Sequence, residues 1–362
     1  MDTTADESRP VRDEDAFDVA AVVDWLRGAD VDVPDGLPEV RQFPGGASNL
    51  TYLLRWPGAA QEAFDLILRR PPVGTKARSA HDMGREYLIQ QALRPVFPYV
   101  ADMVGWCRDP SVLGSDFYVM ERLDGVILRK ELTIELPPAA ASTLCEHAWT
   151  ALARLHGVDV ASIPELATLG RGEGYVARQV GGWTARLARA ATEDLGDWSD
   201  ITTWLRAEQP DDVGQCLIHN DWRFDNLVLD PGAGLRVTGV LDWEMATVGD
   251  PLMDVGGALA YWIQADDDAF FREFRRQPTT APGMWTRRQV VEWYCDRRGI
   301  EMTPQRWRFY EAFGLFRLAV IIQQIWYRFV LGQTHNPSYA GFGDAVRYLE
   351  QRTRRVMCGD PA

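Results

Sequence analysis

The chain has 362 residues, of which 46% are hydrophobic and 11% aromatic, a composition typical of a globular protein with a sizeable core. Its 38 basic and 52 acidic side chains give a net charge of −14, and the first 40 residues alone hold 12 of the acids against 3 bases. The excess of acidic residues therefore lies mostly in the N-terminal 40 residues of the chain. Because a nucleic-acid-binding protein usually carries a basic face, no nucleic-acid partner is expected.

The spacing of the cysteines and the polarity of the longest apolar stretch bear on the cellular compartment of the protein. The five cysteines are widely spaced and form no C-x-x-C motif, which favours free thiols in a reducing compartment over disulfides or a zinc site. The N-terminus has no basic region followed by an apolar one, so it does not read as a secretory signal. The most apolar long stretch, 313–331, is interrupted by Arg317 and Arg328 and is too polar to span a membrane. The sequence predicts a cytoplasmic protein without a membrane partner.

The first third of the chain alternates strands with helices. Residues 1–15 are polar and charged and are expected to form a disordered acidic tail. Apolar residues at helical spacing then predict a helix over 15–27 that ends at Gly28. The remaining predictions are strands at 50–56 and 64–69, a helix at 85–93, and strands at 104–108 and 117–122.

After Asp124 and Gly125 the pattern becomes mostly helical. Helices are predicted at 143–156, 175–192, 288–298 and 305–331, with short apolar runs over 216–241 that suggest a hairpin-like insert. Three consecutive acids, 266–268, are expected to form a solvated turn. The predicted organisation is α+β, with a small β-rich lobe at 16–123 and a larger, mostly helical lobe at 124–362.

One stretch carries the chemistry. His219, Asp221 and Asn226 fit the pattern H-x-D-x-x-x-x-N between apolar runs, and Asp242 follows a further apolar run sixteen residues after Asn226. Phosphoryl transfer needs this set, since one carboxylate must take the proton of the acceptor hydroxyl. A second carboxylate and an amide oxygen suit a magnesium ion that neutralises the phosphates.

The same pattern resembles the aminoglycoside phosphotransferase (APH) family, which has a protein-kinase-like fold with two lobes. The residues in and around this pattern are similar to those of the branch of kinase-like domains linked to acyl-CoA dehydrogenases. Four more segments resemble that branch and extend the resemblance over about 37–350, in the family's order: 43–52, 117–125, 152–156 and 249–254.

The resemblance implies a role for each matching residue. Asp221 would be the catalytic base, and Asn226 and Asp242 would bind Mg²⁺. ATP would be the co-substrate and would bind the first lobe. The remaining implied roles are phosphate contacts at Ser48 and Asn49, adenine contacts at the backbone of Glu121 and Leu123, and support of the catalytic loop by His219 and Asp254.

The cation that binds the nucleotide phosphates is the point at which the sequence departs from typical protein kinases. Arg69 stands on the second predicted strand where a lysine is expected, and Glu86 is its natural partner. An arginine can bridge phosphates with a planar fork rather than a point charge. Lys76 is a competing candidate, although it lies beyond a Pro-Pro break.

The resulting hypothesis is an ATP-dependent phosphotransferase acting on the hydroxyl of a small molecule. Aminoglycosides are polycations, whereas the second lobe offers arginines, so the expected acceptor is neutral or anionic. Three alternatives remain open: an aminoglycoside O-phosphotransferase, a nucleotide-binding pseudokinase without turnover, and a metal-dependent hydrolase built on His219 and nearby acids. The arginines concerned are Arg171, Arg178, Arg186, Arg189, Arg317 and Arg328.

Overall fold

A computed structural model describes residues 8–44, 49–58, 64–72, 82–132 and 134–360. The chain forms two compact units, each made of two stretches of sequence. The first comprises Met1–Ile127 and Leu227–Glu244, and the second comprises Leu128–Asn226 and Met245–Ala362. The boundary expected between lobes was 123/124, and 227–244 was expected in the second lobe.

The first unit is built on a six-stranded sheet with the order β1-β2-β3-β4-β6-β5, in which every neighbouring pair is antiparallel. The predicted strand at 50–56 is confirmed, and the bounds of the other three predicted strands differ from the observed ones by one residue. Its strands are β1 (Arg9–Pro10), β2 (Glu39–Gln42), β3 (Leu50–Trp56), β4 (Phe64–Arg70), β5 (Met103–Cys107) and β6 (Phe117–Glu121), and its helices are α1 (Val19–Gly28), α2 (Met83–Leu93) and α3 (Pro110–Leu113).

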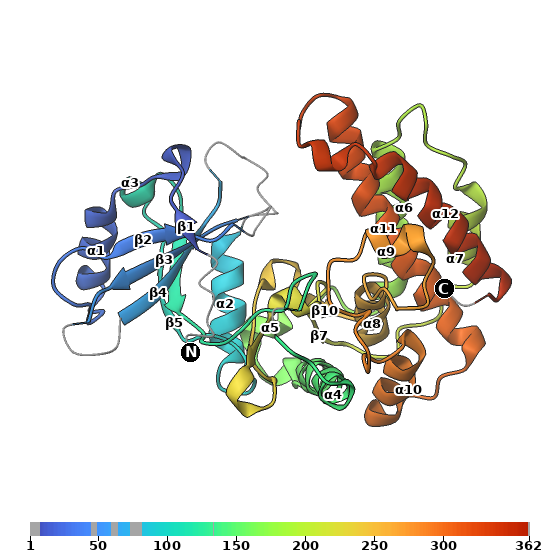
Figure 1. The fold of residues 1–362 in the computed structure, drawn as a ribbon, viewed down its shortest axis with the longest axis horizontal. Coiled ribbons are helices and arrows are strands. Elements are labelled where there is room, and N and C mark those ends of the chain that lie inside the picture. Colours follow the sequence, from blue (N-terminus) through green and yellow to red (C-terminus); the bar gives the residue numbers. More distant parts are fainter. Residues whose placement is uncertain (1–7, 45–48, 59–63, 73–81, 133, 361–362) are drawn as a thin grey trace. The chain divides into compact units, whose positions relative to one another are not determined.

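The two faces of this sheet have separate hydrophobic cores. On one face α1 buries Val22 and Leu26 against strand residues that include Leu54 and Leu68. On the other face Met83 of α2 packs with Leu53 and Ile67, whose side chains point the opposite way along the same strands. Figure 1 shows α1 and α2 on opposite sides of the sheet. The sheet therefore holds α2, which carries Glu86, against strand β4, which carries Arg69.

Residues 8–15, assigned by sequence to the disordered tail, have a defined structure. Residues 9 and 10 pair with β2, and Asp13–Asp15 form a 3₁₀ turn, η1. Asp15 is buried and accepts a hydrogen bond from Gln42 Nε2 at 2.8 Å, while its carbonyl accepts from Tyr52 and Arg70. Composition suggested disorder, but the polar groups of this segment have specific partners in the sheet.

The hairpin formed by β8 (Leu227–Asp230) and β9 (Arg236–Val240) belongs to the first unit. Leu229 bridges to Val126, and the Val240 N–H donates to the Tyr99 carbonyl at 2.6 Å. The apolar runs at 216–241 therefore do not form one insert. The run at Cys216–Ile218 is strand β7, which pairs with β10 (Thr247–Gly249) in the second unit.

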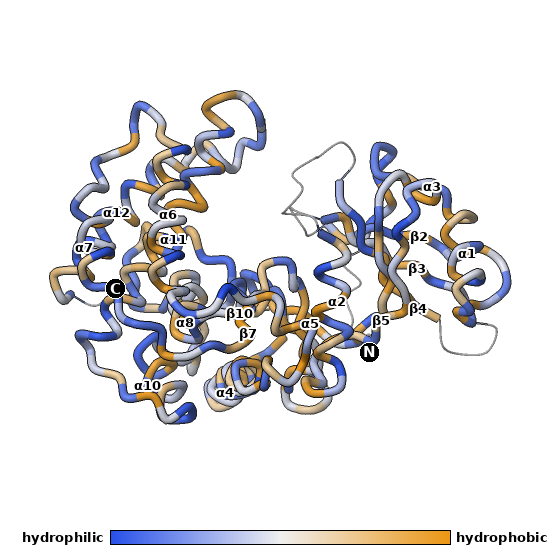
Figure 2. The backbone as a smooth tube through the Cα atoms, turned by 180° about the vertical axis from the view of Figure 1, so that it is seen from behind, coloured by the Kyte–Doolittle hydropathy of each residue, from blue (hydrophilic) through white to orange (hydrophobic). Residues whose placement is uncertain are grey.

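Helices dominate the second unit, as predicted. Its longest helix, α11, packs against α6, α8 and α12. Hydrophilic and hydrophobic stretches alternate along these helices in Figure 2, as expected where one face of each is buried. The helices are α4 (Pro138–Leu155), α5 (Pro164–Ala167), α6 (Tyr175–Arg189), α7 (Ser199–Ala207), α8 (Pro251–Leu259), α9 (Ala269–Glu273), α10 (Arg287–Arg298), α11 (Pro304–Val330) and α12 (Phe342–Cys358).

No helix within the described ranges is long and apolar enough to cross a membrane, and this includes the 27-residue α11.

Candidate active site

The loop that carries Asp221 follows strand β7 in the second unit. Asn220 has a φ of 66°, a left-handed conformation that turns the chain sharply between His219 and Asp221. The Asp221 N–H donates to His219 Nδ1 at 3.3 Å, and the His219 ring is fully buried against Trp222. The loop is thus fixed from within by His219, next to the residue expected to act as the base.

Asp254, in the first turn of α8, stabilises the same loop by accepting hydrogen bonds from its backbone. Its carboxylate accepts the backbone N–H groups of His219 at 2.7 Å and Asn220 at 2.8 Å. Burial acts to raise the pKa of Asp254, but the neighbouring histidines and these backbone donors outweigh it and lower the pKa. Asp254 therefore stays ionised and satisfies two loop amides that would otherwise be buried without a partner.

His156 and Tyr294 extend this support, and the sequence did not identify either as a site residue. His156 Nε2 lies 3.1 Å from Asp254 Oδ2, and its Nδ1 hydrogen-bonds the Tyr294 hydroxyl. Burial lowers the pKa of His156, which favours the neutral ring. The signal available in the sequence was the position of His156 at the end of a predicted helix.

Asn226 lies five residues after Asp221 and contacts it directly. Asn226 Nδ2 donates to the Asp221 carbonyl at 2.8 Å and to Asp221 Oδ2 at 2.9 Å. These two bonds fix the amide, and within the described ranges no residue donates to Asn226 Oδ1. An oriented amide oxygen beside a carboxylate is a donor set that suits Mg²⁺, so these residues fit the expected ion.

In the first unit, Arg69 contacts both Glu86 and Asp242. Arg69 Nη2 lies 3.2 Å from Glu86 Oε1 and 3.3 Å from Asp242 Oδ1. The ion pair predicted between Arg69 and Glu86 is therefore present, and Asp242 is an additional partner. Burial raises the pKa of Glu86, and the Arg69 guanidinium opposes that effect. Asp242 follows β9 with a φ of 64° and presents its carboxylate to this pair.

The remaining residues expected at the nucleotide have different surroundings. Asn49 is 2% exposed, and its Nδ2 donates to Glu244 Oε2 at 3.3 Å. The Glu121 N–H donates to the Asp102 carbonyl. No described residue accepts from the Leu123 N–H, so that group is available to the edge of an adenine ring. Ser48 and Lys76 lie outside the described residues.

Asp221 and Asn226 belong to the second unit and Asp242 to the first. Their convergence on one magnesium ion stays a prediction.

An apolar cavity of about 250 Å³ lies in the second unit. Arg223, which contacts Asp221, forms part of its wall, and Arg276 also lines it. The cavity therefore adjoins the expected catalytic base within the same unit. Six of the side chains that make it apolar are Ile263, Phe271, Leu318, Ile322, Phe342 and Leu349.

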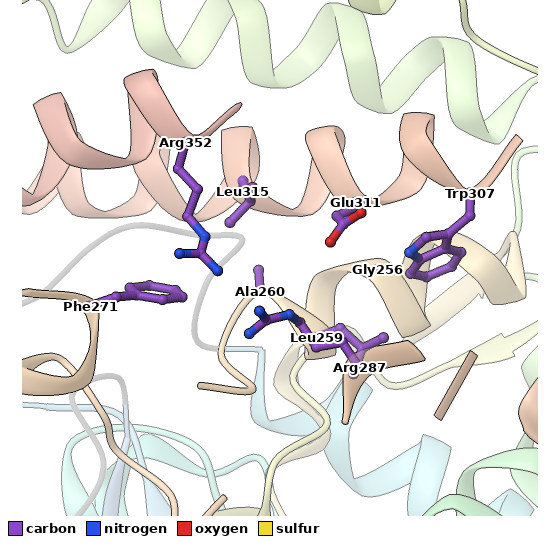
Figure 3. A pocket seen from close by; sticks show the side chains of 9 residues that line it. All are labelled: Gly256, Leu259, Ala260, Phe271, Arg287, Trp307, Glu311, Leu315 and Arg352. Carbon is purple, nitrogen blue, oxygen red and sulfur yellow. The ribbon is translucent and has the colours of Figure 1, made fainter. Parts of the chain in front are cut away.

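The prediction of a solvated turn at 266–268 is wrong for Asp267, whereas Asp266 and Asp268 are exposed. Asp267 is 8% exposed and accepts hydrogen bonds from Arg287 at 2.7 and 2.9 Å and from Arg352 at 2.5 Å. Figure 3 shows Arg287 and Arg352 beside Phe271 at a small second cavity. The prediction was wrong because these arginines come from distant parts of the sequence, and their charges hold Asp267 in the interior.

Residues 39–292 match the model of the APH phosphotransferase enzyme family. The chain belongs to this family. Similar APH relatives include mouse acyl-CoA dehydrogenase family member 10, 34% identical over 327 residues, with 90% of this chain and 30% of that protein covered. Human acyl-CoA dehydrogenase family member 11 is 33% identical over 326 residues, covering 86% of this chain and 39% of its own length. The chain thus spans about a third of these relatives.

Solved structures place this APH chain among kinase-like folds. A Ralstonia eutropha JMP134 structure, provisionally named an aminoglycoside phosphotransferase, has a TM-score of 0.78 at 29% identity and covers 96% of this chain and 100% of its own. Choline kinase from Cryptosporidium parvum Iowa II has a TM-score of 0.62 at 9% identity, with 94% and 96% covered. The expected protein-kinase-like fold, with a β-rich first lobe and a helical second lobe, is confirmed.

Proposed function

We propose that this APH-family protein transfers the γ-phosphoryl group of ATP to a hydroxyl of a small neutral or anionic molecule, with Mg²⁺ as cofactor. The observation that carries the proposal is the pair of hydrogen bonds from Asn226 Nδ2 to Asp221. They hold an expected metal ligand and an expected base in one fixed arrangement. A braced loop of this kind suits a reaction in which positioning and charge neutralisation do most of the work.

Asp221 acts on the acceptor. Its carboxylate orients the hydroxyl and takes its proton, while the oxygen forms a bond to the γ-phosphorus. The bond between that phosphorus and the β,γ-bridging oxygen breaks, and its electron pair leaves with ADP. A magnesium ion held by Asn226 and Asp242 would supply positive charge to the phosphate oxygens. His219 and Asp254 keep the loop in place during these changes.

The first unit supplies groups for the nucleotide. Arg69 is held between Glu86 and Asp242 and offers a guanidinium fork that matches phosphate oxygens. The available Leu123 N–H suits the edge of an adenine ring. A structural neighbour at 16% identity and a TM-score of 0.55 was solved as a streptomycin–ATP complex. Its nucleotide is consistent with ATP as the co-substrate of this fold.

The apolar cavity beside Asp221 supports an acceptor with a hydrophobic body. Its volume of about 250 Å³ and its wall of aliphatic and aromatic side chains suit an uncharged group. A polycation would have to leave water and meet Arg223 and Arg276 there, and the described residues of the cavity wall include no carboxylate to compensate. An aminoglycoside is therefore the less favoured acceptor.

Positive charges on α6 and α11 also favour a neutral or anionic acceptor over an aminoglycoside. Two guanidinium carbons lie near the centre of the Trp183 ring, that of Arg186 at 4.5 Å and that of Arg317 at 5.5 Å. Burial lowers the pKa of Arg186, with further contributions from Arg189 and Arg317. Within the described ranges, no carboxylate forms an ion pair with any of these three arginines. Arg317 also donates to the Asn220 carbonyl at 2.7 Å, which links this positive region to the catalytic loop.

An ADP-release screen tests the proposal. The full chain is incubated with ATP, with and without Mg²⁺, against hydroxylated metabolites, CoA thioesters of hydroxy acids and aminoglycosides. We expect magnesium-dependent turnover with a neutral or anionic alcohol, and a phosphate ester by mass spectrometry. Asp221→Asn should reduce kcat by about 10² to 10⁴-fold and keep MgATP binding. Asp266→Asn, at an exposed acid of the same unit, is the control.

Two outcomes would contradict the proposal. Turnover of aminoglycosides alone would make the protein an antibiotic-modifying enzyme. MgATP binding without turnover of any alcohol would make it a pseudokinase.

A further inference from the structure

Arg223 is a charged residue of the catalytic loop to which neither the resemblance nor the proposed mechanism gives a task. It stands two residues after Asp221, and its Nη2 lies 3.1 Å from Asp221 Oδ2. The same nitrogen lies 3.5 Å from Asp225 Oδ2. One guanidinium is thus shared by two carboxylates that are four residues apart in the sequence.

The rest of the Arg223 side chain faces the cavity. Its guanidinium carbon lies 5.1 Å from the centre of the Tyr261 ring, and both residues line the apolar cavity of about 250 Å³. The Arg223 side chain is 21% exposed, so it is neither sealed in the core nor free in solvent. Arg223 therefore touches the expected base on one side and the expected acceptor cavity on the other.

At this position Arg223 can contact negative charge that develops on the acceptor oxygen and on the phosphoryl group. The acceptor oxygen must come within hydrogen-bond distance of Asp221 to give up its proton. The phosphoryl group must then approach that same oxygen, with negative charge spread over its three equatorial oxygens. A cation 3.1 Å from the Asp221 carboxylate is within side-chain reach of both.

We propose that Arg223 is a catalytic residue of the phosphoryl transfer, an inference that rests on the proposed function. In the free protein its guanidinium pairs with Asp221 and Asp225 and offsets one of their two negative charges. In the reacting complex it donates to the phosphoryl group in transit, while the acceptor O–H bond breaks toward Asp221 and the new P–O bond forms. Arg223 stays protonated throughout, and ADP leaves with the electron pair of the broken bond.

The chemistry of arginine supports this role over a purely structural ion pair. A planar guanidinium has five N–H donors and matches phosphate oxygens in pairs, which a lysine cannot do. The partial burial of the site strengthens the interaction because less water screens it. A conservative exchange to lysine should therefore keep the charge and lose most of the function.

The test compares Arg223→Ala and Arg223→Lys with wild type. The control is Arg288→Ala, whose side chain is 86% exposed and pairs with Glu292 on the surface of the same unit. Arg223→Ala should reduce kcat with the acceptor found in the screen by about a hundredfold or more. The KM for MgATP should stay within about threefold, and Arg223→Lys should recover only part of the loss. The control should match wild type.

A second measurement needs no acceptor and separates catalysis from folding. MgADP with aluminium fluoride mimics the phosphoryl group in transit, and MgADP alone does not. Wild type should bind MgADP more tightly when aluminium fluoride is present, and Arg223→Ala should lose that gain while binding MgADP alone as wild type does. Thermal unfolding identifies a variant that fails to fold, in which case Arg223→Lys carries the comparison.

The outcomes distinguish the two proposals. If Arg223→Ala keeps turnover within about threefold of wild type, or the full gain from aluminium fluoride, Arg223 is not catalytic while the proposed function stands. If wild type neither binds MgATP nor releases ADP, the proposed function fails and this inference fails with it.

Discussion

The Arg69 guanidinium lies between two carboxylates, 3.2 Å from Glu86 and 3.3 Å from Asp242. Glu86 is 1% exposed, and the Arg69 guanidinium opposes the rise in its pKa that burial causes. Asp242 is the more accessible partner, with 31% of its side chain exposed. Arg69 therefore supports a buried acid on α2 and at the same time contacts an expected metal ligand after β9.

Removing Arg69 should affect stability and nucleotide binding together. Arg69→Gln leaves the Glu86 carboxylate buried without its cation, so we expect a loss of about 3 kcal/mol in the free energy of unfolding. MgATP affinity should fall as well. Urea denaturation and nucleotide titration measure the two effects. Arg94→Gln is the control, because its pair with Asp102 is exposed and should contribute less than about 1 kcal/mol. Equal losses in the two variants would contradict this account.

Asp254 should control turnover without touching substrate. Asp254→Asn replaces a charged acceptor of the His219 and Asn220 amides by a neutral group with one acceptor oxygen. We expect kcat to fall by about 10²-fold, because the loop that carries Asp221 loses its fixed geometry. MgATP binding should change much less. Steady-state kinetics check this against Asp266→Asn, and an unchanged kcat would show that the loop is held by other contacts.

Filling the apolar cavity should affect only the acceptor. Ile322 lines the cavity on α11, so Ile322→Trp is expected to raise the acceptor KM by about tenfold or more. The KM for MgATP should not change. Val330→Trp, at a 52% exposed position of the same helix, controls for the added indole. If both variants behave alike, the acceptor binds elsewhere.

Asp250 should give the stability of the protein a recognisable pH dependence. Burial raises the pKa of Asp250 to about 6, and the backbone donors Val213, Leu252 and Met253 oppose that rise. The folded state thus binds this proton more tightly than the unfolded state, whose reference pKa is 3.8. The stabilising contribution is complete below pH 4 and is lost as pH rises to about 6.

The measurement is the free energy of unfolding of wild type and Asp250→Asn at several pH values. The wild-type value minus the variant value should fall by about 3 kcal/mol between pH 4 and 7. A difference that stays constant, or rises, would show that Asp250 is ionised at an ordinary pKa.

Local patterns predicted much of this structure, and distant partners explain most of what they missed. The strand at 50–56 and the pair Arg69–Glu86 follow from alternation and from the order of strand and helix. The contact between Arg69 and Asp242 joins residues 173 positions apart, and no local sequence pattern predicts it. Asp267 looked solvated because its partner Arg352 lies 85 residues further along.

The first unit is assembled from two stretches of chain, since residues 227–244 join Met1–Ile127. A fragment ending at 127 would lack the hairpin that bonds to Tyr99 and Val126, together with Asp242. Cutting the gene after residue 127, close to the point where the predicted strands give way to helices, would consequently leave two incomplete pieces. A gene in which a short linker replaces residues 128–226 and which ends at residue 244 would make the two stretches contiguous, and it would be the appropriate way to study the first unit alone.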